Sequence, residues 1–79
     1  MRHQLAQRIK LLRKQKKYSQ QELAERSSVS LGSYKRFEKS GQISLESLLR
    51  IAFILDRLDE FEKIFVPNNL IEIEKLFNE

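Results

Sequence analysis

The chain has 79 residues, no cysteine, and 15 Lys and Arg against 11 Asp and Glu, so its net charge at pH 7 is +4. This length predicts one domain with a small core, to which dimerisation would add stability. The lack of cysteine excludes disulfides and thiolate metal sites, and the longest apolar run, Ile51–Leu55, is far too short to span a bilayer.

The first expected element is a helix from about Arg2 to Lys16. Leu5, Ile9 and Leu12 recur there at the spacing of one helix face, which predicts that they face the core. The remaining positions are rich in Lys and Arg. A membrane-surface helix would show the same basic polar face, but the core needs the three apolar residues, so we expect no membrane partner.

Two short helices joined by a turn follow. Ser19 is placed to cap the first of them, with Glu22 completing a capping box, and Ser30 is placed to cap the second. Tyr34 and Phe37, three residues apart, mark the inner face of the second helix. This pattern predicts a helix-turn-helix unit, whose second helix enters the major groove of DNA.

A break at Gly41 and a cap at Ser44 predict a fourth helix, with Leu48 and Ile51 in its buried stripe. The residues before Gly41 and those after it differ sharply in charge. Residues 1–40 carry 11 basic and 3 acidic side chains, a net +8, whereas the remaining residues carry 4 basic and 8 acidic side chains, a net −4. A polyanion would be attracted to the first part and repelled by the second.

The last residues predict two short helices. The first contains Phe61, Ile64 and Phe65 and is expected to stop at Pro67. Asn69 is placed to cap the second. The overall expectation is an all-α chain of five helices plus a short C-terminal helix.

The ordered combination of these motifs resembles the Cro/phage-repressor (XRE) family of bacterial and phage regulators. The residues that carry the resemblance are Leu5-x3-Ile9-x2-Leu12-Arg13, Ser19-Gln20-x-Glu22-Leu23-Ala24, Val29-Ser30, Phe37-Glu38 and Ser44-Leu45-x2-Leu48-x2-Ile51-Ala52. The resemblance implies a five-helix lambda-repressor-like DNA-binding domain, here placed over residues 1–66, that acts as a homodimer on a pseudo-palindromic operator in double-stranded DNA. Residues 67–79 are expected to form a docking or dimerisation tail, and the lack of cysteine fits a cytoplasmic, nucleoid-associated protein.

The resemblance and the helical arrangement of the residues together predict two sets of DNA contacts. The expected base-reading residues are Leu31, Gly32, Ser33 and Arg36. The expected phosphate-binding residues are Arg13, Gln20, Ser30, Lys35, Lys39, Gly41 and Ser44. Arg36 is the expected partner of guanine, because arginine to guanine O6/N7 is the commonest specific major-groove contact. Arg13 and Glu38 match a pair that ties the first helix to the third in similar proteins, although an incidental surface ion pair is the alternative.

Two positions depart from the family pattern. Ser28 stands in the turn where glycine is usual, which predicts either a left-handed serine or a slightly different turn. Gly32 presents no side chain to the groove. It is explained either by close approach of the DNA or by a neutral replacement.

Apolar residues outside the predicted core suggest a dimer interface. Its expected members are Phe53, Phe61, Ile64, Phe65, Ile73 and Phe77. A terminal helix of about ten residues is below the length that is stable alone, so it must dock on a partner or on its own domain. Both options are open from the sequence.

Three other classes of function were weighed. An antitoxin that binds a partner toxin as well as DNA is the main alternative to a repressor that blocks its own promoter. An enzyme is not expected, because His3 is the only histidine and no paired-carboxylate, metal-ligand or phosphate-loop spacing is present. No cofactor or metal is therefore expected. RNA binding is disfavoured, because no exposed aromatic stacking residues are foreseen.

Overall fold

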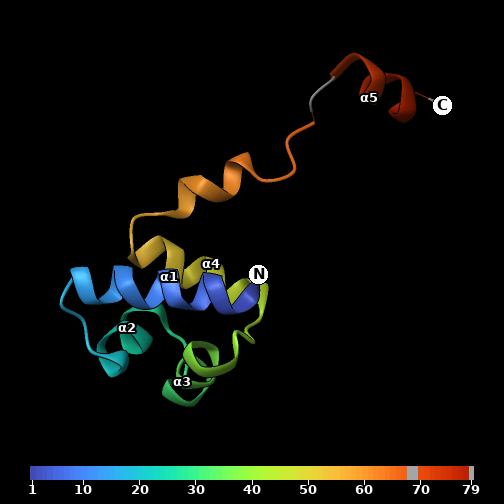
Figure 1. The fold of residues 1–79 in the computed structure, drawn as a ribbon. Coiled ribbons are helices and arrows are strands. Elements are labelled where there is room, and N and C mark those ends of the chain that lie inside the picture. The colour runs from blue at the N-terminus through green and yellow to red at the C-terminus, as the bar shows by residue number, and fades with distance from the viewer. Residues whose placement is uncertain (68–69, 79) are drawn as a thin grey trace.

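The computed structural model describes residues 1–67 and 70–78, with side chains for 1–67 and 74–78, and is all-helical over that part of the chain (Figure 1). The elements in order are α1 (Arg2–Gln15), α2 (Gln20–Ser27), α3 (Leu31–Ser40), α4 (Leu45–Ile54), the 3-10 helix η1 (Leu58–Lys63) and α5 (Leu70–Phe77). The expected all-α fold is confirmed. None of the described helices is long and apolar enough to cross a bilayer.

The core lies between the first four helices. α1 packs on α3, and α2 packs on both α3 and α4. Its largest fully buried side chains are Leu23, Tyr34, Phe37 and Ile51. Tyr34 and Phe37 meet edge to face, with ring centroids 6.2 Å apart. The two aromatic residues of α3 are thus core residues, as the helical spacing predicts.

Serine caps begin three successive helices. The side chains of Ser19, Ser30 and Ser44 accept hydrogen bonds from the backbone N–H three residues on, at 3.0, 3.1 and 3.1 Å. The predicted capping box at Ser19 is only half formed. The Glu22 carboxylate pairs with Arg26 one turn later, at 3.2 Å, so the cap itself comes from the serine.

Left-handed residues end each of the first four helices. Lys17, Ser28 and Asp56 have φ near +60°, and the amide that follows each donates to the carbonyl five residues back. This is the Schellman arrangement, here built without glycine. The serine in the turn is therefore left-handed. The end of α3 uses Gly41 instead (φ +79°), because a Cβ there would lie 2.8 Å from the backbone carbonyl carbon of Arg2.

The fifth helix differs from its prediction. It is a 3-10 helix that ends at Lys63, four residues before Pro67, so the proline does not stop it. Of its three expected apolar residues, Phe61 alone packs against the core. Ile64 and Phe65 lie beyond the helix and are 52% and 96% exposed. With one apolar anchor, this segment lacks the buried stripe that would sustain a longer α-helix.

α5 stands apart from the other helices (Figure 1). The radius of gyration is 15.8 Å, against about 12 Å for a compact domain of this length. The apolar side chains of Leu76 and Phe77 are 71% and 85% exposed. The predicted cap Asn69 and the side chain of Ile73 lie outside the described residues. The tail therefore adds length to the molecule without adding to its core.

Candidate nucleic-acid interface

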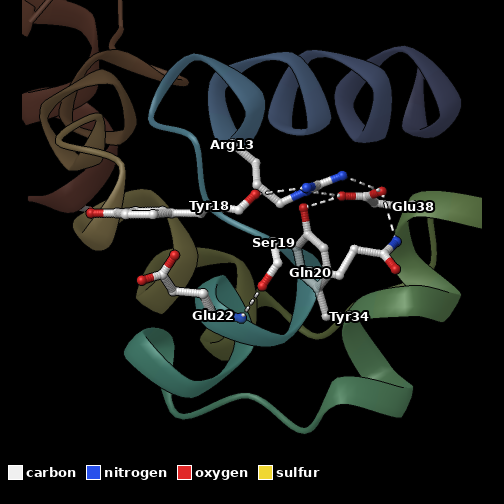
Figure 2. A network of polar contacts seen from close by, with 7 residues as sticks. All are labelled: Arg13, Tyr18, Ser19, Gln20, Glu22, Tyr34 and Glu38. Carbon is white, nitrogen blue, oxygen red and sulfur yellow. Dashed lines mark hydrogen bonds and ion pairs between the residues drawn. The ribbon is translucent and has the colours of Figure 1, made fainter.

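A buried carboxylate ties α3 to the two helices before it (Figure 2). Glu38, near the end of α3, accepts hydrogen bonds from Arg13 of α1 at 2.8 Å and from Gln20 of α2 at 3.0 Å. It also accepts one from the hydroxyl of Tyr34, one turn earlier on α3. The predicted Arg13–Glu38 pair is present and buried, with side-chain exposures of 9% and 7%. It is a central contact of the fold and no incidental surface pair.

The partners of Glu38 keep its charge in place. Burial alone would raise the pKa of Glu38, but hydrogen bonds from Arg13, Tyr34 and Gln20 outweigh it and lower the pKa below its ordinary value. Burial and the hydrogen bond to Glu38 raise the pKa of Tyr34, which stays protonated. Glu38 is the one acidic residue of α3. Its charge is neutralised inside the domain and does not face the helix's outer side.

The phosphate-binding role predicted for Arg13 stays a prediction, and its guanidinium is already engaged within the fold. Its residue exposure is 7%, and its guanidinium donates to Glu38 and, at 2.8 Å, to the backbone carbonyl of Tyr18. A phosphate would have to displace these partners. Arg13 instead fixes the position of α3 relative to α1.

Gln20 begins α2 and is half-buried. One N–H of its amide donates to Glu38, which holds the side chain at the helix N-terminus. Helix N-termini present backbone N–H groups to anions. The network thus orients the side chain of Gln20, which the sequence analysis predicts to bind a phosphate.

The outer face of α3 is exposed and cationic. Its exposed members are Gly32, Ser33, Lys35, Arg36 and Lys39. None of its three cations forms an ion pair with another described residue. The surface turned away from Tyr34 is therefore available to a polyanion.

Three other residues predicted to contact DNA, at the start of α3, have only part of their side chain or hydrogen-bonding capacity free. Leu31 is half-buried and packs against the core, so only part of its side chain reaches the outer face. The hydroxyls of Ser30 and Ser33 bond each other at 2.8 Å while Ser30 caps the helix.

The structure shows open space around Gly32. A Cβ built there would meet nothing within 4 Å. The protein's own packing therefore does not require glycine. Close approach of a ligand and neutral replacement are both still consistent with the site.

A hollow of about 290 Å³ lies between α3 and the start of α4. Ser33, Arg36, Gln42 and Ser44 are among the residues that line it. The sequence analysis did not predict that Gln42 lies at this surface. The feature that could have indicated it is its position directly after the left-handed Gly41, which turns the chain back beside α3.

The N–H that Gly41 is expected to offer to a phosphate is likewise engaged within the fold, and its phosphate-binding role stays a prediction. This N–H donates to the carbonyl of Phe37 at 2.7 Å, and the residue is buried. Glycine is needed here for the left-handed turn and for the close contact with Arg2.

The predicted interface residues do not form one patch within a single chain. Phe53 lines one surface hollow, and Phe61 and Ile64 line another. Phe65 and Phe77 are exposed apart from both. Within the described part of the chain, no group of His, Cys, Asp or Glu is arranged to hold a metal ion.

A comparison with family models matches residues 9–61 to a helix-turn-helix model of the Cro/phage-repressor (XRE) type. The match covers α2, α3 and α4 and more than half of the chain. Comparisons with curated proteins and with solved structures gave no match.

Proposed function

The chain belongs to the Cro/phage-repressor (XRE) family of helix-turn-helix DNA-binding transcription regulators, and we propose that it acts as a homodimeric repressor of its own promoter, on a pseudo-palindromic operator. The observation that carries the proposal is the exposed, cationic outer face of α3, fixed in place by the Glu38 network.

Arg36 is the principal reader of sequence in this proposal. It is exposed at the centre of the outer face, beside the hollow that Gln42 lines. A guanidinium there matches the two acceptors of guanine in the major groove. Ser33 and the exposed part of Leu31 would contact adjacent base edges, and Gly32 would allow the helix backbone to come close.

The other groups set the register through phosphates. Lys35 and Lys39 flank Arg36 on the exposed face. Gln20 retains a second amide N–H beyond the one it gives to Glu38, and Ser30 and Ser44 lie at the N-termini of α3 and α4. Such contacts orient the protein on the duplex without reading its sequence.

Two copies are required for useful specificity, because one recognition helix reaches only a few base pairs. A two-fold dimer places its recognition helices one helical turn of DNA apart, at roughly 34 Å. A protein held across a promoter in this way excludes polymerase, which is the simplest form of repression.

The test is selection of bound sequences from random DNA, followed by titration of the selected site at two salt concentrations. We expect an inverted repeat and an affinity that falls steeply as salt rises, since cations are released from the phosphates on binding. Enrichment of no sequence, or of a single half-site bound by a monomer, would contradict the proposal.

The second candidate is an antitoxin that represses its operon and also binds a toxin. The feature that favours it is the exposed apolar tail, with Leu76 and Phe77 uncovered. Co-expression with the neighbouring reading frame decides between the two. Stable co-purification of its product with the wild-type chain, lost on removal of the tail, would favour the antitoxin.

A further inference from the structure

An apolar groove runs along α1 where this helix meets α4 and η1. The residues that matter here are Leu5, Leu11 and Leu12 of α1, Ala52 of α4, and Phe61 and Ile64 at the C-terminal end, around a volume of about 620 Å³. We call this the α1 groove. None of its lining residues comes from α2 or α3, so an occupant would leave the DNA-facing surface uncovered.

The groove carries positive charge. α1 has no acidic residue, and Arg8 and Arg57 line the groove against one carboxylate, Glu60. The Arg57 side chain is already paired with Glu60 at 2.8 Å. Arg8 forms no ion pair with another described residue. An apolar partner with acidic flanks is therefore the best match to this surface.

α5 has those properties. Its eight residues read LIEIEKLF, apolar with two Glu against one Lys. The exposed Leu76 and Phe77 lie at its C-terminal end. A helix of this length is not stable in water without a surface to pack on.

The lengths of the two elements agree. Eight helical residues extend about 12 Å, and the stretch of α1 from Leu5 to Gln15 that lines the groove extends about 16 Å. A helix of the size of α5 therefore covers most of the groove without overhanging it.

The course of the chain favours a second copy over the chain's own tail. Pro67 disfavours a helical conformation at Val66, and α5 stands away from the groove of its own chain (Figure 1). If α5 folded back onto its own groove, Phe65 and Val66, 96% and 57% exposed, would still face water at the bend. In an exchanged two-fold dimer, the Ile64–Val66 segments of the two copies would be able to cover each other.

We propose that the protein dimerises by reciprocal exchange of its tails, each α5 docking in the α1 groove of the other copy. The arrangement is isologous, since each copy gives a tail and receives one. The exchange rests on the proposed homodimeric function, and it assigns the α1 groove as the surface that receives the tail.

The direct test is cross-linking between copies. The chain has no cysteine of its own, so the cross-linker can react only with the cysteines that are introduced. An unlabelled Leu11→Cys chain is mixed, without DNA, with a 15N-labelled Leu76→Cys chain and treated with a short thiol cross-linker. Mass spectrometry identifies the mixed dimer. The control replaces Leu11→Cys by Leu45→Cys, which is similarly exposed (64% against 62%) but lies outside the groove.

We expect the mixed dimer with Leu11→Cys and little with Leu45→Cys. Equal yields from the two, or no mixed dimer, would overturn the exchange. A Leu11→Cys/Leu76→Cys double variant that closes within one chain would also overturn it, since the tail would then occupy its own groove. If the wild type still sediments as a dimer and binds an inverted repeat, the proposed function stands while the exchange fails.

Charge reversal gives an independent readout. Arg8→Glu should raise the dimer dissociation constant about fivefold in sedimentation, and adding Glu74→Lys should restore it. Lys10→Glu makes the same charge change on α1 but lies outside the groove, so we expect a shift below about twofold. An equal shift for Arg8→Glu and Lys10→Glu, or no recovery in the double variant, would contradict the docking.

Discussion

The first 55 residues and the segment from η1 onward are organised in opposite ways. The first part holds every buried apolar residue of the described core, although Leu11, Leu45 and Phe53 are exposed there, and no buried side-chain polar atom of the described residues lacks a partner. In the second, Ile64, Phe65 and Phe77 are exposed. The DNA-binding unit therefore completes its own core and its own caps, whereas the described side chains at the end of the tail present an apolar surface that the chain's own core does not cover.

The largest loss of stability in the first region is expected from removing the charge of Glu38. Glu38→Gln should lower the free energy of unfolding by about 3 kcal/mol, because Arg13 is left buried without a counter-charge. Urea unfolding followed by circular dichroism measures the change. Glu25→Gln, an exposed change of the same chemistry on α2, should change it by less than ~0.5 kcal/mol. Similar effects of the two substitutions would contradict a central role for Glu38.

The same carboxylate predicts acid sensitivity. The folded chain lowers the pKa of Glu38, so the unfolded chain binds the proton more tightly. The stability that Glu38 contributes is complete above its unfolded pKa of about 4.3 and is lost as the pH falls through the lower, folded value. Urea midpoints between pH 6 and pH 3 should fall more steeply for the wild type than for Glu38→Gln. If the urea midpoints of the two proteins fell in parallel, carboxylates other than Glu38 would set the pH dependence of stability.

Substitution by alanine should have opposite effects on stability at the two glycines. Gly41→Ala should destabilise the fold by about 2–3 kcal/mol, from its left-handed conformation and the contact with the Arg2 backbone. Gly32→Ala should stabilise it by up to about 1 kcal/mol, because its Cβ meets open space. The midpoints of thermal unfolding of the two variants, compared with that of the wild type, measure both effects.

DNA titration of Gly32→Ala then decides why that glycine is present. Lost affinity with gained stability indicates close approach of the DNA. Unchanged affinity indicates a neutral replacement. Destabilisation by Gly32→Ala would contradict the open space described around it.

Changes in the tail should have the smallest effect on folding. Phe77→Ser removes an exposed side chain, so the free energy of unfolding at nanomolar protein should change by less than ~0.5 kcal/mol. Dimerisation at micromolar protein should weaken at the same time. A loss above about 1 kcal/mol at the lower concentration would show that the tail belongs to the core of its own copy.

The sequence predicted the first region well because its signals are local. The serine caps at Ser19, Ser30 and Ser44 follow from one side chain and a nearby amide. The inward faces of α1 and α3 follow from helical spacing. The long-range Arg13–Glu38 pair came from the family resemblance, since a contact 25 residues apart leaves no local pattern.

The features that the sequence could not show have a common physical cause. The N–H groups of Arg13 and Gly41, predicted to bind phosphate, form hydrogen bonds inside the fold with which a phosphate would have to compete. The sequence shows a donor but not its partner. The fifth helix was misjudged at Ile64 and Phe65 because periodicity alone does not show whether a core is within reach.

The central claim is that the exposed face of α3 reads DNA through Arg36 and holds it through Lys39. The most direct measurement is the affinity of the wild type, Arg36→Ala and Lys39→Ala for a selected operator and its single-base variants. We expect Arg36→Ala to lose about 1–3 kcal/mol and its preference at one base pair per half-site, and Lys39→Ala to weaken every sequence alike. The same uniform loss for both variants would contradict the claim.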